Sequence, residues 1–297
     1  MRILVTGASG FIGGHLVNNL LKKTHNVHVL TRPSTNLGLF GTNINHIVCH
    51  EHDGSTISMI KLVEQAQPDA VIHLASLFIS EHGSEDVENL INSNILLSTQ
   101  LIESMTLNDV RLLINAGTSW QHYQNRNYSP VNLYAATKQA FVSLLRFYVE
   151  TTNLNVINLE LFDTFGPNDR RAKIFNLFDS AAKTGKPLLM SPGDQYIDPI
   201  YIDDVTNAFV VALNRLDTGL VEGEETYSVT SDSPVNLKRL AEIYEKVTGK
   251  NLNIEWGERP YRTREVMRPW SKGNSLPGWS PIISIQDGIN RITQNIV

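Results

Sequence analysis

The chain has 297 residues, 41% of them hydrophobic and 19% charged, which is enough for one large globular domain or two modest ones. Its net charge of −5 gives no overall positive field to attract nucleic acid or an anionic membrane. The single cysteine, Cys49, cannot form an internal disulfide, and no apolar run reaches the roughly 18 residues of a membrane span. We therefore expect a cytoplasmic protein without a membrane anchor.

Strand-like and helix-like segments alternate through the first half of the chain. Near-continuous apolar strands that alternate with helices are typical of an α/β fold, in which a doubly wound parallel sheet is covered by helices on both faces. Apolar runs predict strands at 2–7, 26–32, 44–53, 69–76, 110–119 and 154–163. Helical spacing predicts helices at 11–23, 55–67, 86–105, 132–151 and 236–250.

A glycine-rich turn joins the first predicted strand to the first predicted helix. Gly7, Gly10 and Gly13 have the spacing G-x-x-G-x-x-G. A dinucleotide needs a tight turn there, close approach of the backbone to its pyrophosphate, and a helix N-terminus pointing at it. The context predicts a dinucleotide-binding Rossmann fold.

The end of the second predicted strand selects the form of the dinucleotide. An acidic residue there would bind a ribose 2′-hydroxyl, whereas an arginine would bind a 2′-phosphate. Arg32 stands at this position, so we predict NADP(H) as the cofactor. A plain surface arginine is the alternative reading.

Tyr134 and Lys138 lie four residues apart in a predicted helix and so face the same way. An ammonium group beside a phenol favours the phenolate, so we expect Lys138 to lower the pKa of Tyr134. Tyr134 would then exchange a proton with an alcohol or carbonyl near neutral pH. Thr118, at the tip of a neighbouring strand, can hydrogen-bond the same oxygen.

Several stretches together resemble an extended short-chain dehydrogenase/reductase of the nucleotide-sugar epimerase, dehydratase and reductase kind. The resemblance covers essentially the whole chain and rests on TGASGFIG (6–13), HLAS (73–76), Thr118, Tyr134 with Lys138, LFDTFGP (161–167) and PGDQYIDPIYIDDV (192–205).

This resemblance implies a Rossmann domain and a smaller mixed α/β lobe that holds a nucleoside diphosphate sugar. We expect residues 1–163 and about 197–216, as a strand and a helix, in the first, and about 164–196 and 217–297 in the second. It implies that Thr118 and Tyr134 hold the sugar carbonyl or alcohol, and that Lys138 binds the nicotinamide ribose. The implied cofactor contacts are Gly7, Ser9, Gly10, Phe11, Ile12, Gly13, Arg32, Asp53 beside the adenine, Leu74, Ala75 and Lys138. Many relatives dimerise through two helices, which here are 86–105 and 132–151.

Departures from the family pattern reduce the number of reactions that the chain could catalyse. Dehydratases typically carry Thr-Asp-Glu where this chain has Thr118, Ser119 and Trp120, so the carboxylates for dehydration are missing at this tip. We expect Ser119 and Trp120 to contact the sugar, although Trp120 is equally a candidate packing residue. His122 is expected to hydrogen-bond within its loop, and an extra proton carrier near Thr118 is the alternative.

The residues at the positions that bind the diphosphate in this family also differ from the family pattern. Glu160 and Ile197 stand where relatives often have arginines, and Asp163 replaces an asparagine. An arginine guanidinium can bind phosphate through two parallel hydrogen bonds. Among several nearby cations we therefore expect Arg171 and Arg264 to bind the diphosphate. Asp163 is also expected to contact the substrate. The cluster of Cys49, His50 and His52 lacks a second group of ligands, and no metal is expected.

The leading hypothesis is an NADPH-dependent reductase of the C4 ketone of a CDP- or dTDP-linked 4-keto-6-deoxyhexose, similar to reductases of the abequose and paratose synthase kind. An NAD-dependent nucleotide-sugar 4-epimerase is the alternative. A non-catalytic NADP(H)-binding regulator is a more remote one, because degenerate regulators commonly lose the Tyr or Lys that this chain keeps.

Overall fold

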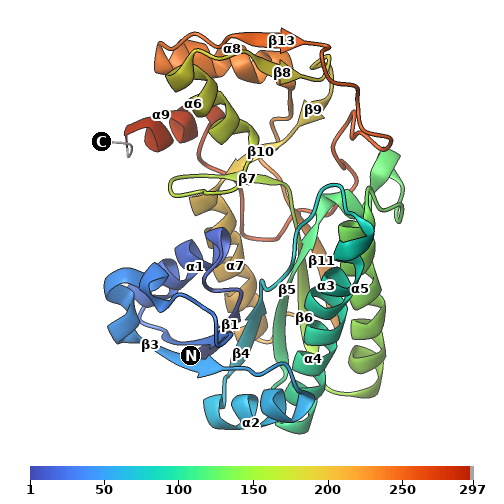
Figure 1. The fold of residues 1–297 in the computed structure, drawn as a ribbon. Coiled ribbons are helices and arrows are strands. Elements are labelled where there is room, and N and C mark those ends of the chain that lie inside the picture. The colour runs from blue at the N-terminus through green and yellow to red at the C-terminus, as the bar shows by residue number, and fades with distance from the viewer. Residues whose placement is uncertain (295–297) are drawn as a thin grey trace.

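The computed structural model describes residues 1–294, and its centre is a seven-stranded sheet in the order β11-β6-β5-β4-β1-β2-β3 (Figure 1). Every neighbouring pair of strands is parallel. The order reverses between β1 and β4, which opens a crevice at the carboxyl edge of the sheet where ligands bind in such folds. The strands are β1 (Arg2–Thr6), β2 (Asn26–Thr31), β3 (Ile47–Glu51), β4 (Ala70–His73), β5 (Leu112–Thr118), β6 (Asn155–Leu161) and β11 (Glu224–Val229).

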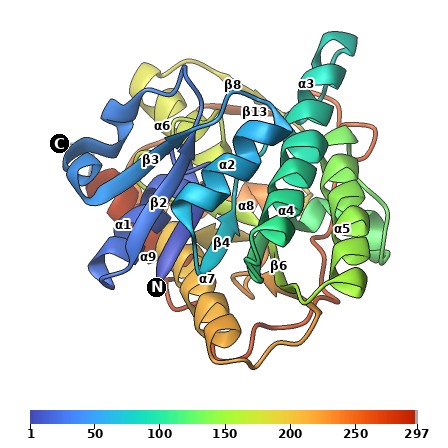
Figure 2. The same ribbon diagram turned by 90° about the horizontal axis from the view of Figure 1, so that it is seen from below.

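Helices cover both faces of this sheet, which confirms the doubly wound α/β fold (Figure 2). Apolar side chains of α1 and α7 pack on one face, and those of α2, α4 and α5 pack on the other. The helical elements of this part are α1 (Phe11–Lys22), η1 (Leu37–His46), α2 (Thr56–Ala66), η2 (Ser84–Asp86), α3 (Val87–Ile91), the π-helical turn η3 (Asn92–Leu96), α4 (Leu97–Leu107), η4 (Ser119–Gln121), η5 (Tyr123–Asn125), α5 (Leu133–Thr151) and α7 (Ile202–Asp217). No helix within residues 1–294 is long and apolar enough to cross a membrane.

A second hydrophobic cluster lies above the carboxyl edge of the sheet (Figure 1). Phe178 of α6 and Tyr244 of α8 are fully buried in it, and Ile289 of α9 joins them. Its elements are β7 (Asp163–Phe165), α6 (Ile174–Thr184), β8 (Leu188–Met190), β9 (Tyr196–Ile197), β10 (Pro199–Tyr201), β12 (Val235–Asn236), α8 (Leu237–Thr248), β13 (Ile254–Trp256) and α9 (Ile285–Gln294).

Two parts of the expected domain division differ from the structure. Residues 224–229, assigned from sequence to the smaller lobe, form β11 and pair with β6 in the central sheet. Their sequence EETYSV lacks a continuous apolar run because β11 is an edge strand with one side free. The strand expected near 197 pairs with β7 outside the central sheet, although α7 packs on α1 and β6 as expected. The rest of the division stays a prediction.

Candidate active site

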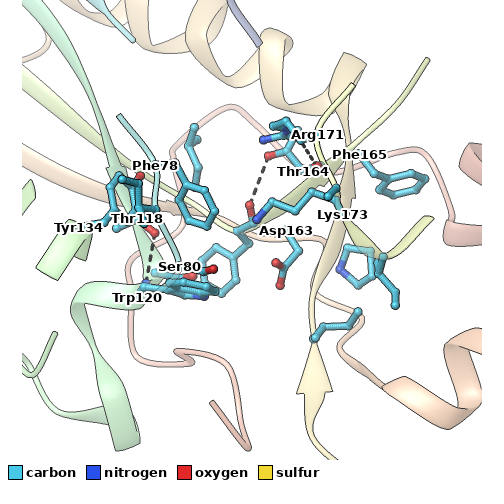
Figure 3. A pocket seen from close by; sticks show the side chains of 18 of the residues that line it. Phe78, Ser80, Thr118, Trp120, Tyr134, Asp163, Thr164, Phe165, Arg171 and Lys173 are labelled. Atoms are coloured by element: carbon cyan, nitrogen blue, oxygen red, sulfur yellow. Dashed lines mark hydrogen bonds between the residues drawn. The ribbon is translucent and has the colours of Figure 1, made fainter. Parts of the chain in front are cut away.

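A cavity of about 1180 Å³ lies at the carboxyl edge of the sheet, between the sheet and the second hydrophobic cluster. Its walls come from the glycine-rich turn, the segment after β4, the tip of β5, the start of α5, the chain from 161 to 177, and residues 259–265. Figure 3 shows Thr118 and Tyr134 on one side of it and Asp163, Arg171 and Lys173 on the other. The cavity thus joins the predicted dinucleotide turn to the predicted catalytic residues.

The glycine-rich turn fits a dinucleotide. Gly7 has a φ of +69°, and a Cβ there would lie 2.6 Å from the backbone nitrogen of Ala75. A Cβ on Gly13 would lie 2.2 Å from the carbonyl oxygen of Gly7, so both positions require glycine. Helix α1 starts after Gly10 without a side-chain cap, so the first amide groups of the helix are open to an anion such as a pyrophosphate.

The other expected cofactor residues fall into two groups. Phe11, Ile12 and Leu74 line the cavity with the three glycines, whereas Ser9 is exposed beside it and Ala75 packs against Gly7. Arg32 and Asp53 follow β2 and β3 at the same edge of the sheet but lie outside the lining of this cavity. The Asp53 carboxylate accepts a hydrogen bond of 2.8 Å from the Ser55 amide, which lowers its pKa.

Thr118, Tyr134 and Lys138 meet at one wall of the cavity. Thr118 is the last residue of β5, and Tyr134 and Lys138 lie on consecutive turns of α5. The side chain of Asn132 caps this helix by accepting a hydrogen bond of 2.9 Å from the Ala135 amide, which fixes where the helix begins. The hydroxyl groups of Ser76 and Thr118 lie near the Tyr134 hydroxyl and stabilise its ionised form.

The ionisation of this group differs from the expectation. Burial raises the pKa of Tyr134 to about 12, and the nearby hydroxyl groups of Ser76 and Thr118 only partly oppose the rise. Burial lowers the pKa of Lys138 to about 8. The expectation that Lys138 depresses the pKa of Tyr134 is therefore wrong in this structure, because loss of solvent dominates. Tyr134 thus keeps its proton at neutral pH, as an ordinary tyrosine does.

An aromatic wall stands next to Tyr134. The ring of Phe78 lies 5.0 Å from the Tyr134 ring and 5.6 Å from the Trp120 ring, measured between centroids. The Lys173 ammonium lies 4.1 Å above the Phe78 ring and reaches across from the start of α6 (Figure 3). Trp120 is therefore both a packing residue and part of the cavity wall, which its sequence position alone left open.

Asp163 lies across the cavity from Tyr134, at the start of β7 (Figure 3). Burial raises the pKa of its carboxyl group, and the positive charge of Lys173 opposes that rise. Ser119 also lines the cavity. The structure thus brings Ser119, Trp120 and Asp163 to the place expected for the substrate.

The arginines of the cavity differ from those expected. Arg171 lines it, but its guanidinium already donates two hydrogen bonds of 2.7 Å to Asp169. Arg264 is outside the lining and donates a hydrogen bond of 2.7 Å to Ser129 Oγ. Arg259 and Arg262 of the same segment line the cavity in its place. Sequence carried no signal for this choice, because a loop has no periodicity that shows which side chains turn inward.

His50, on the third strand, contacts a histidine of the neighbouring strand. His50 Nε2 lies 2.8 Å from His28 Nδ1, and the two rings stack. Within residues 1–294 there is no cluster of three or more His, Cys, Asp or Glu side chains that could hold a metal.

Comparison with known proteins identifies the family. Residues 3–229 match the model of the NAD dependent epimerase/dehydratase family. The chain belongs to this family. The membership confirms the resemblance seen in the sequence and makes the chain an NAD(P)-dependent enzyme of the nucleotide-sugar class.

Relatives within the family carry different activities in their names. The chain is 28% identical to a CDP-abequose synthase of Salmonella muenchen, over 98% of this chain and 96% of that one. It is 27% identical to a UDP-glucuronate 4-epimerase of Thermodesulfobacterium geofontis, over 97% and 94%. A crystal structure of a UDP-glucose 4-epimerase from Thermotoga maritima, with UDP-glucose, superposes with a TM-score of 0.86 at 20% identity, over 99% and 98%, which shows the shared fold.

Proposed function

We propose that this protein is an NADPH-dependent reductase that converts the C4 ketone of a nucleotide-linked 4-keto-6-deoxyhexose to an alcohol in deoxysugar biosynthesis. CDP and dTDP are the proposed nucleotides. The observation that carries the proposal is that Tyr134 and Thr118 line the cavity together at a strand tip that has Trp120 where a dehydratase carries a carboxylate. Reduction of one carbonyl needs a single proton donor, and the proposal assigns this role to Tyr134.

Each residue of the wall then has a role. A bound nicotinamide dinucleotide supplies the hydride. Tyr134 donates its proton to the carbonyl oxygen at C4, and the Thr118 hydroxyl orients that oxygen by a hydrogen bond. Lys138 holds the nicotinamide ribose. Phe78 and Trp120 offer an apolar face to the 6-methyl group of a deoxysugar, and Asp163 and Ser119 can bond its hydroxyls.

The substrate's diphosphate is assigned to the cationic side of the cavity. Arg171, Arg259 and Arg262 line that side, and an arginine can donate paired hydrogen bonds to phosphate oxygens. Arg171 and Arg262 are bonded to Asp169 and Glu265 and would have to exchange these partners for phosphate. The proposed CDP linkage is supported by the CDP-abequose synthases of Salmonella muenchen and Yersinia pseudotuberculosis, at 28% and 29% identity over nearly the whole chain.

A 4-epimerase with retained NAD is the second candidate. It is favoured by the 27% identity to a UDP-glucuronate 4-epimerase over 97% of the chain, which is close to the identity to the abequose synthases. Retained cofactor after purification, with an epimerised product and no net oxidation of NADPH, would support this candidate over the first.

The deciding experiment is a screen of CDP-, dTDP-, GDP- and UDP-4-keto-6-deoxyhexoses with NADPH, followed by NMR of the product. We expect oxidation of NADPH with one or more of these substrates and a hydroxyl at C4 of the product. If NADPH binds but is not oxidised with any of these substrates, the result would contradict the proposal and favour a non-catalytic regulator.

A further inference from the structure

An irregular segment near the C-terminus connects the cavity to the loop behind Thr118. We call residues 259–276 the arm and residues 119–131 the tip loop. Arg259 and Arg262 at the start of the arm line the cavity, and the Arg262 guanidinium lies 5.6 Å from the centre of the Trp120 ring in the tip loop. The arm therefore carries two of the arginines of the cavity, of which Arg262 is ion-paired with Glu265 at 3.2 Å.

The arm has no regular secondary structure. No helix or strand occurs between β13 and α9, and one isolated bridge joins Ser275 to Ser228 of β11. Backbone hydrogen bonds tie the arm to its neighbours at Arg259, Met267 and Asn274, and between Met267 and Asn274 it is held by contacts with the tip loop. Arg264 and Ser271 supply two of these contacts with the tip loop, through hydrogen bonds of 2.7 Å to Ser129 and 2.9 Å to Asn125.

The third contact is a stack of two rings. The Trp270 ring lies parallel to the His122 ring at 4.1 Å between centroids, with an angle of 15°. The Trp270 Nε1 is buried and has no hydrogen-bond partner among residues 1–294. Stacking and apolar packing, rather than a hydrogen bond, hold this side chain.

Glu160 fixes the His122 ring. Its Oε1 lies 2.6 Å from His122 Nε2, both side chains are only 8% exposed, and the Ser228 hydroxyl donates to its Oε2 at 3.1 Å. The other ring nitrogen, Nδ1, lies 3.1 Å from the Arg126 carbonyl oxygen. The ring is held at both nitrogens, so its face toward Trp270 is fixed. The hydrogen-bonding role expected of His122 is confirmed, and Glu160, where relatives often carry arginine, completes it.

We propose that Trp270, stacked on the His122 ring that Glu160 orients, is a positioning residue that holds the arm against the tip loop and so keeps Arg262 at the cavity. Arg259 is placed separately, by the hydrogen bond from its amide to the Met190 carbonyl. The identity of the ligand of Arg262 as a nucleoside diphosphate rests on the proposed function. The positioning itself rests on the contacts of the arm with the tip loop. Without the stack, the arm would have to order Arg262 at the moment of binding, which weakens affinity.

The test compares Trp270→Leu with Trp270→Phe and with a control, Trp279→Leu. Trp279 packs against the main core, and its Nε1 donates to the Asp204 carbonyl at 3.0 Å. In Trp270→Leu we expect the Kd for CDP or dTDP, measured by calorimetry, to rise about tenfold or more. The Kd for NADPH should stay within about twofold of wild type, because the glycine-rich turn is untouched. Trp270→Phe, which keeps a flat ring over His122, should restore nucleotide affinity, and Trp279→Leu should leave it unchanged.

Limited trypsinolysis gives a readout that needs no ligand. Cleavage after Arg262 and Arg264 should accelerate in Trp270→Leu relative to cleavage elsewhere, and not in Trp279→Leu. Wild-type nucleotide affinity or a wild-type cleavage pattern in Trp270→Leu overturns the inference, as does the same change in Trp279→Leu. If the wild-type protein binds neither CDP nor dTDP, the proposed function fails, and the cleavage comparison alone then decides whether the stack positions the arm.

Discussion

Burial raises the pKa of Tyr134 to about 12, so its hydroxyl stays protonated from neutral pH well into the alkaline range. We expect Tyr134→Phe to bind NADPH normally but to lose turnover by roughly 10²–10⁴-fold, since the ring is retained and only the proton donor is removed. Calorimetry of NADPH binding and steady-state kcat measure the two effects. Near-normal turnover in this variant would show that another group donates the proton.

Lys138 makes stability depend on pH. Burial lowers its pKa from an ordinary value of 10.5 to about 8, so between these pH values the unfolded chain binds more protons than the folded one. The free energy of unfolding therefore gains from this group as pH rises from 8 toward 10.5, and its full penalty applies below pH 8.

Replacing this lysine should separate stability from function. We expect Lys138→Met to raise the free energy of unfolding at pH 7 by up to about 3 kcal/mol, to remove that gain above pH 8, and to weaken activity. Urea denaturation of the wild-type protein and the variant at pH 7 and pH 9.5 measures the free energy of unfolding and its change with pH. A variant that is less stable at pH 7, or that keeps the wild-type difference between the two pH values, would refute this account.

Arg32 is the proposed determinant of the cofactor. It is exposed at the carboxyl end of β2, where a 2′-phosphate can reach it. Arg32→Ala should weaken NADPH binding by about 10–100-fold, because one charged hydrogen-bonding group is lost, and leave NADH binding unchanged. Calorimetry with both dinucleotides checks this. Equal or tighter binding of NAD(H) than of NADP(H) by the wild-type protein would exclude the preference.

The helix predicted at 86–105 is a composite element. The 3-10 turn η2, α3, the π-helical turn η3 and α4 follow one another along it, and Asn94 is buried within η3. The Asn94 amide accepts from the Leu77 amide at 2.7 Å, and donates to the Leu77 carbonyl at 3.0 Å and to Thr137 Oγ1 at 2.9 Å. One side chain thus ties the segment after β4 to the helix that carries Tyr134.

Removing this tie should affect both stability and chemistry. We expect Asn94→Ala to lower the free energy of unfolding by about 3 kcal/mol, since the backbone groups of Leu77 lose their partner. The kcat should fall as well, because Ser76 and Tyr134 lie beside that segment. Asn89→Ala, at an exposed position of α3, should change stability by less than about 0.5 kcal/mol. Similar effects of the two substitutions on urea denaturation would argue against a special role for the π-helical turn.

The helices and strands were predictable from the sequence to different degrees. The central strands and α5 were placed within a few residues, because a continuous apolar run or a helical spacing marks each of them. The π-helical turn was not predictable, because it depends on hydrogen bonds from Asn94 to residues 17 and 43 positions away.

At the scale of the whole molecule, exposed apolar side chains gather on neighbouring helices. The composite helix of α3, η3 and α4 runs beside α5 at one side of the sheet (Figure 2). Ile91, Leu96, Leu144 and Phe147 on these helices and the π-helical turn are 38% to 62% exposed. Apolar surface on adjacent helices supports the proposed homodimer through this face.

Charged substitutions test that assembly. We expect the double variant Leu144→Glu, Phe147→Glu to shift sedimentation velocity from a dimer to a monomer, because carboxylates would be buried against a second copy. Leu220→Glu, at a position that is 64% exposed in the segment between α7 and β11, should leave the assembly unchanged. A wild-type protein that sediments as a monomer at micromolar concentration would rule out the dimer.

The sequence by itself determined the features that depend on residues close together in the chain. The glycine spacing, the alternation of strands and helices, and the four-residue step from Tyr134 to Lys138 are of this kind, and they identified the family and one wall of the candidate active site. Tertiary structure decided the rest: that β11 joins the central sheet, that Arg259 and Arg262 rather than Arg264 line the cavity, that Trp270 stacks on His122, and that the pKa of Tyr134 is raised rather than lowered. These features depend on burial and on contacts between distant parts of the chain, and no local pattern of residues specifies either.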